Sequence, residues 1–198
     1  MKKDIILAGV GGQGILSIAA IIGTAAMGAD LYLKQAEVHG MSQRGGDVQS
    51  NLRLSDKPVA SDLIPKGQAD MIIAVEPMEG LRYISMLAED GWLITNSNPY
   101  INIKNYPDIG DILNEIKTLP RHIIIDADEI AKDLGNKKAA NMVILGAALP
   151  FLGMDIKLFH NAVGDIFGSK GEDIVKLNID ALQAGMDFAN NNKRSPEK

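Results

Sequence analysis

The chain has 198 residues with a formal net charge of −5, and hydrophobic residues make up 46% of it. This length suits one α/β domain with a substantial core, which we expect over residues 1–190, followed by a disordered tail over residues 191–198. The net negative charge argues against a nucleic-acid-binding protein, which would carry clustered lysine and arginine. No apolar run reaches the roughly 18 residues of a membrane span and no signal peptide is recognisable, so we expect a cytoplasmic protein.

The absence of cysteine excludes several classes of chemistry. With no cysteine in the sequence, the chain can form no disulfide, offers no thiol nucleophile and cannot ligate an iron–sulfur cluster. His39, His122 and His160 lie far apart in the sequence and show no spacing typical of a metal site. We therefore expect no metal on this chain, and any iron–sulfur cluster must belong to another polypeptide.

The beginning of the chain predicts a strand, a glycine-rich turn and a helix. An apolar run over residues 4–10 leads into the sequence GVGGQG at residues 9–14, and a helical pattern follows. Gly9, Gly11 and Gly14 fit the G-x-G-x-x-G spacing, in which glycines allow a tight turn, close approach of a ligand and close packing of helix on strand. The N–H groups at the helix start could hold an anion. The alternative is a turn whose glycines serve only steric needs.

One companion of a dinucleotide site is missing. Such a unit usually carries an acidic residue about 20 residues after the glycines, where it binds ribose. Here the predicted second strand, residues 30–36, has Lys34 and Gln35 near its end, and Glu37 follows slightly late. Ordinary NAD binding is therefore disfavoured.

The middle of the chain alternates predicted strands with predicted helices. Residues 47–54 alternate apolar and polar side chains, which predicts a half-buried strand near an antiparallel edge. Further strands are predicted at residues 70–75, 91–95 and 121–125, and helices at residues 77–89, 108–119 and 126–134. The predicted fold class is therefore α/β: a three-layer, Rossmann-like, mostly parallel sheet with helices on both faces.

The last third is predicted to be helical, with helices at residues 139–151, 155–167 and 171–190. The helix predicted at residues 13–27 is apolar on nearly every face, so either another helix or another subunit must cover it. Because the apolar surface of these helices exceeds what one sheet face needs, we predict that part of it is a subunit interface. The isolated chain is then expected to self-associate, for example as a homodimer, or to show a large exposed apolar patch.

Two glycine-rich stretches and one strand end supply the candidate ligand-binding residues. Arg44 lies beside two glycines, where its guanidinium could bind a phosphate or carboxylate. Glu76 closes a strand at the sheet edge where α/β proteins bind ligands, but as the residue before Pro77 it could equally cap a helix. No catalytic residue is predicted. The predicted ligand-binding set, which we expect to converge on one anion-accepting cleft, is Gly9, Gly11, Gly12, Gln13, Gly14, Ser42, Gln43, Arg44, Gly45, Gly46 and Glu76.

Several segments together resemble a known family. They are GVGGQG at residues 9–14, QRGG at 43–46, residues 70–76, NMVILG at 141–146, and FGSKG at 167–171 with Asn178. These segments are similar to the gamma-type domain of 2-oxoacid:ferredoxin oxidoreductases, and the resemblance covers nearly the whole chain. Within that family, residues 38–46 and 76–82 are most similar to the beta subunit of indolepyruvate ferredoxin oxidoreductase.

The resemblance implies a non-cluster subunit, inactive alone, of an enzyme that oxidatively decarboxylates aryl 2-oxoacids. It implies coenzyme A as acyl acceptor and ferredoxin as electron acceptor, with thiamine diphosphate, Mg²⁺ and 4Fe–4S clusters on a large partner subunit. The sequence agrees, since it lacks both cysteine and the G-D-G signature of thiamine diphosphate. Coenzyme A is a possible shared ligand. The alternatives are a gamma subunit acting on pyruvate or 2-oxoglutarate, a free-standing nucleotide-binding oxidoreductase, and a non-enzymatic scaffold.

Overall fold

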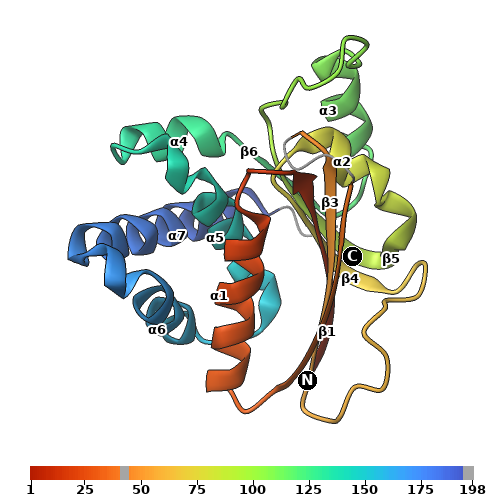
Figure 1. Cartoon of the computed structure of the whole chain (residues 1–198). Coiled ribbons are helices and arrows are strands. Elements are labelled where there is room, and N and C mark those ends of the chain that lie inside the picture. Colours follow the sequence, from red (N-terminus) through yellow and green to blue (C-terminus); the bar gives the residue numbers. More distant parts are fainter. Residues whose placement is uncertain (41–44, 194–198) are drawn as a thin grey trace.

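A six-stranded sheet crosses the middle of the structure, a computed structural model that describes residues 1–40 and 45–193 (Figure 1). The strand order is β2-β3-β1-β4-β5-β6. Within the described residues, β3 runs antiparallel to both neighbours, whereas β1, β4, β5 and β6 pair in parallel. The predicted mostly parallel sheet with an antiparallel strand at residues 47–54 is therefore confirmed. The strands are β1 Lys2–Val10, β2 Tyr32–His39, β3 Asp47–Ser55, β4 Ala69–Ala74, β5 Leu87–Asn96 and β6 His122–Ile125.

Helices cover both faces of the sheet, as predicted. The described helices are α1 Ile15–Gly28, α2 Pro77–Arg82, α3 Ile109–Lys117, α4 Ala127–Asp133, α5 Ala140–Leu152, α6 Ile156–Phe167 and α7 Glu172–Asn192. Helices α2 and α3 lie on one face, α1 and α5 lie on the other, and α6 and α7 form a further layer outside α1 and α5 (Figure 1). In the part of the chain that the structure describes, no helix combines the length and apolarity needed to cross a membrane.

Two helix boundaries differ from the prediction. The helix predicted at residues 77–89 ends at Arg82, and after a short 3₁₀ turn, Ile84–Met86, strand β5 begins at Leu87. Leu87 pairs with Ala69 of β4, so the pairing requirement of the sheet overrides the local helical periodicity. The last helix, α7, is predicted to end at residue 190 but continues through Asn192. The side-chain amide of Asn192 donates to the Phe188 carbonyl at 2.8 Å within this last turn. The predicted tail beyond residue 193 lies outside the described residues.

The central strand β1 explains the apolar run at the start of the sequence. From Ile5 to Ala8 its side chains are buried on both faces, as expected for a strand that has neighbours on each side and helices above and below. Ile5 and Leu7 face α1 and α5, and Ile6 and Ala8 face α2 and α3. This strand carries the glycine turn to the edge of the sheet.

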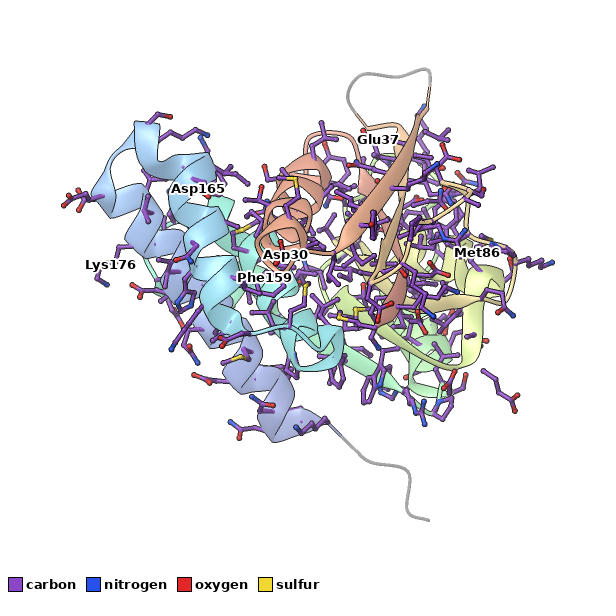
Figure 2. All side chains as sticks on the ribbon, turned by 90° about the horizontal axis from the view of Figure 1, so that it is seen from below. Asp30, Glu37, Met86, Phe159, Asp165 and Lys176 are labelled. Atoms are coloured by element: carbon purple, nitrogen blue, oxygen red, sulfur yellow. The ribbon has the colours of Figure 1, made fainter. Side chains whose placement is uncertain are left out.

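Another helix of the same chain covers the apolar helix α1. Phe159 of α6 is fully buried and lies between the C-terminal helices and α1 (Figure 2). Of the two alternatives drawn from the sequence, a covering helix or a covering subunit, the described residues therefore show the first. Leu16 and Met27 of α1 remain exposed.

Helices α5 and α7 approach each other closely at two glycines. A Cβ on Gly146 of α5 would lie 2.1 Å from the Leu182 carbonyl oxygen, and one on Gly185 of α7 would lie 2.0 Å from the Val143 carbonyl oxygen. Both neighbours are backbone atoms, so a side chain could enter only if the helices moved apart. Two glycines thus set the separation of α5 and α7.

We expect Gly185→Ala to destabilise the protein by about 1–3 kcal/mol, because overpacking a tight core forces backbone shifts. Gly164→Ala in α6 is the matched control, since no atom lies within 4 Å of its Cβ position. The control should stabilise the protein by roughly 0.5–1 kcal/mol through helix propensity. Urea unfolding of both variants measures the two effects. Equal effects, or a stabilised Gly185→Ala, would refute the close approach of α5 and α7.

A buried polar network ties α2 to the start of β3. Glu79 accepts two bonds from Arg82, at 2.6 Å from Nε and 3.1 Å from an Nη, and the Tyr83 hydroxyl donates to Asp47 at 2.6 Å. Burial raises the pKa of Glu79, and the neighbouring Asp47 carboxyl raises it further, while Arg82 opposes the shift. Burial and Asp47 also raise the pKa of Tyr83.

The raised pKa of Glu79 makes stability depend on pH. The folded state holds the Glu79 proton more tightly than the unfolded chain, in which a glutamate has a pKa of about 4.3. The stabilising contribution is present below that value and is lost as the pH rises through the folded-state pKa. Glu79→Gln, which cannot ionise, should therefore reduce the loss of unfolding free energy between acid and neutral pH. The exposed control Glu89→Gln should keep the wild-type slope, and an unchanged slope in Glu79→Gln would contradict the shift.

Candidate functional site

A cavity of about 640 Å³ opens at the carboxyl ends of the parallel strands. Its walls come from the turn after β1, the ends of β4 and β5, the starts of α4 and α5, and the region where α6 leads into α7. This edge is where open α/β sheets bind ligands, because the loops after successive strands meet there. The cavity therefore lies where the glycine motif predicted a site.

The glycine turn is shaped by close contacts on both sides. Gly9 packs against Val75, the residue directly after β4, since a Cβ on Gly9 would lie 2.3 Å from Cγ2 of Val75. Gly14 has a φ of 80°, and its Cβ position lies 2.4 Å from Nδ2 of Asn141, which donates to the Gly14 carbonyl at 3.2 Å. The side-chain oxygen of Gln13 accepts the Val10 N–H at 2.8 Å. Gly12, Gln13 and Gly14 line the cavity, whereas Gly9 fits the steric role considered for the motif.

The second glycine-rich stretch lies beside the first. The Gly11 N–H donates to the Gly46 carbonyl at 2.8 Å, and Asn102 donates to the Gly45 carbonyl at 2.7 Å. The two stretches thus meet at the same edge of the sheet. The Gly11 N–H is already bonded to a backbone carbonyl and is therefore not free to bind a ligand. Gly11, Gly45 and Gly46 do not line the cavity. Ser42, Gln43 and Arg44, predicted to bind the anion, lie outside the described residues.

Glu76 is a buried support for the site. Its side chain has no exposed surface, and its carboxylate accepts the Glu79 N–H at 2.8 Å, the Tyr100 N–H at 3.3 Å and the Tyr106 hydroxyl. Burial raises the pKa of Tyr106, and Glu76 adds to the shift. Of the two roles drawn from the sequence, helix capping is observed, and Glu76 is absent from the cavity wall. It holds in place the loop after β5, whose residues 98–100 do line the cavity.

The strongest charges in the cavity were missed by sequence reasoning. Among the described lining residues, three are lysines and one is acidic, which leaves a net charge of +2. The acid, Asp128, accepts bonds from Asn96 at 2.8 Å and from Asn98 at 3.1 Å. The lysines are Lys137, Lys138 and Lys170, and further side-chain amides come from Asn136, Asn141 and Asn178.

An apolar wall completes the cavity. It is formed by Ile144 of α5, Phe167 of α6, and Ile174 and Leu177 of α7. A positive, amide-rich cavity with one apolar wall suits a phosphate-bearing ligand that also has a less polar part. Two of the segments quoted above, residues 141–146 and 167–171, supply part of this lining. Lys137 and Lys138 carried no sequence signal, because only the fold brings the start of α5 beside the glycine turn.

The residues of this chain do not suit an iron–sulfur cluster. The sequence has no cysteine, and within the described residues no group of three or more histidine, aspartate or glutamate side chains gathers as a metal site would require. The described lining residues of the cavity offer lysine, amide and apolar side chains instead.

Comparison with known proteins identifies the family of the chain. The sequence matches the family described as pyruvate ferredoxin/flavodoxin oxidoreductase over residues 4–188. It is 39% identical to the indolepyruvate oxidoreductase subunit IorB of Archaeoglobus fulgidus, over 96% of both chains. The structure is similar to the gamma subunit of a keto/oxoacid ferredoxin oxidoreductase from Geobacter sulfurreducens, with a TM-score of 0.71, 26% identity and coverage of 96% and 99% of the two chains.

A longer relative contains the same unit. The ketoisovalerate oxidoreductase subunit VorA of Methanothermobacter marburgensis is 28% identical over 94% of this chain, but the match spans only 36% of that protein. The family match across nearly the whole sequence, together with the 39% identical relative, shows that this chain belongs to the pyruvate ferredoxin/flavodoxin oxidoreductase family.

Proposed function

We propose that the chain is the small, cluster-free subunit of an indolepyruvate ferredoxin oxidoreductase. The observation that carries this proposal is the 39% identity to a subunit of an indolepyruvate oxidoreductase over 96% of both chains. The enzyme would oxidatively decarboxylate aryl 2-oxoacids, with coenzyme A as acyl acceptor and ferredoxin as electron acceptor, in the cytoplasm. This chain would be inactive alone.

The cofactors of such an enzyme belong on the large partner subunit. Thiamine diphosphate with Mg²⁺ supplies carbanion chemistry when bound, and 4Fe–4S clusters carry electrons. A chain without cysteine cannot hold those clusters, and its sequence lacks the thiamine diphosphate signature. Its contribution is then to bind and position a substrate for a centre on the partner.

The ligand that best fits the cavity is coenzyme A. Lys137, Lys138 and Lys170 would bind its phosphates, and the start of α1 adds the partial positive charge of a helix N-terminus. The wall around Phe167 offers an apolar surface to the rest of the molecule. Gly12, Gln13 and Gly14 would approach the ligand through their backbone, and Arg44 would add a further cation from the second glycine stretch.

We expect Lys138→Ala and Lys170→Ala each to weaken coenzyme A binding about tenfold or more, since a charge-assisted hydrogen bond contributes roughly 1.5–3 kcal/mol. Lys176→Ala is the control, because Lys176 lies on the outer side of α7 and pairs with Asp180 at 2.5 Å (Figure 2). Calorimetry on the reconstituted complex measures all three variants. Equal weakening by the control would argue against the cavity, and tight binding of NAD(P) in its place would favour a free-standing nucleotide-binding oxidoreductase.

The substrate is tested by turnover of the reconstituted two-subunit complex. Reduction of ferredoxin should be fastest with indolepyruvate or phenylpyruvate and slower with pyruvate and 2-oxoglutarate. Each subunit assayed alone should be inactive. Preference for pyruvate or 2-oxoglutarate would reassign the chain as the gamma subunit of another 2-oxoacid enzyme, and full activity without this chain would leave it the role of a scaffold.

A further inference from the structure

The loop that follows β5 presents apolar side chains to solvent at the rim of the cavity. Tyr100, Ile101 and Ile103 are 43%, 71% and 44% exposed, and Tyr100 also lines the cavity. These three fall within four consecutive positions, a clustering in sequence that the other large exposed apolar side chains of the described residues do not show. Residues 99–107 contain a single charged residue, Lys104. We call the segment 100–103 the rim loop.

The rim loop is held from beneath, although its tip is exposed. Glu76 accepts the Tyr100 N–H at 3.3 Å and also the hydroxyl of Tyr106. One buried carboxyl group thus holds the first residue of the rim loop and a residue shortly after it. Between these points, Asn102 donates to the Gly45 carbonyl at 2.7 Å. A loop anchored in this way loses little conformational entropy when a partner covers it.

The position of the loop indicates which partner covers it. The chain has no cysteine for a cluster, so under the proposed function a ligand held in the cavity presents its reacting end through the cavity mouth to a centre on another subunit. That subunit must then face the rim, where Ile101 and Ile103 would be buried. In the longer relative the matched unit spans only 36% of the protein, so further chain is joined to it in the same polypeptide.

We propose that the rim loop is the docking element for the large, thiamine- and cluster-bearing subunit, a role that rests on the proposed function. Ile101 and Ile103 insert into an apolar pocket of that subunit. Tyr100 lies at the junction, with one side toward the ligand cavity and the other toward the partner. Docking and completion of the ligand site are thereby one event.

The test is titration of the purified large subunit with variants of this chain. Ile101→Asp and Ile103→Asp should each raise the Kd at least about tenfold, since they place a charge in the buried centre of an interface. Ile101→Leu should bind within about threefold of wild type, because it keeps the apolar volume. Leu63→Asp is the matched control: Leu63 is 58% exposed, and its carbonyl is bound by Arg53, near the opposite end of the sheet.

The outcomes separate the two proposals. If wild type binds and the aspartate variants bind equally well, the docking role of the rim loop is wrong and the proposed function stands. If wild type itself fails to bind, the proposed function fails, and the docking role fails with it. If the aspartate variants bind the large subunit normally but lose self-association in light scattering, the loop contacts a second copy of this chain and the docking proposal is overturned.

Discussion

The contact between Asn141 and Gly14 joins the two halves of this protein. The residues are 127 positions apart, and the Asn141 amide donates to the Gly14 carbonyl at 3.2 Å. Gly14 permits the contact in two ways: its φ of 80° favours glycine, and a side chain there would collide with the same amide. The contact fixes the start of α5 beside the start of α1. Residues at both helix starts line the cavity.

The helices behind the cavity are closely packed. Gly146 and Gly185 let α5 and α7 approach to backbone contact. The fully buried carboxyl group of Glu76 accepts hydrogen bonds from α2 and from the loop after β5. Burying a polar group is costly unless it is hydrogen-bonded, and these bonds link α2 to the loop after β5. The lysines that line the cavity come from two separate segments, and Asp128 is the acidic side chain among the described lining residues.

Much of the fold could be predicted from the sequence, because the apolar patterns that specify strands and helices are local. The buried run of β1, the alternation in β3 and the helices of the last third follow directly from periodicity. The end of α2 could not be predicted in this way, since it depends on the pairing of Leu87 with Ala69. The covering of α1 by α6 likewise depends on tertiary packing.

The candidate site was predicted less completely, for a physical reason. A glycine turn is visible in sequence because its spacing is local, and three of its residues line the cavity. Lys137, Lys138 and Lys170 belong to two distant segments, and only the fold brings them to the same cavity. Glu76 depends on the fold in the same way. Only the fold shows that the loop after β5 covers this residue, which caps α2 and does not line the cavity.

Hydrogen exchange of the reconstituted complex with and without coenzyme A tests most directly whether the cavity between the glycine turn and the C-terminal helices binds this ligand. Bound coenzyme A should slow amide exchange in residues 12–17 and 137–141, and should leave residues 56–63 at the other end of the sheet unchanged. Binding of coenzyme A without slower exchange in those two segments would contradict binding in this cavity.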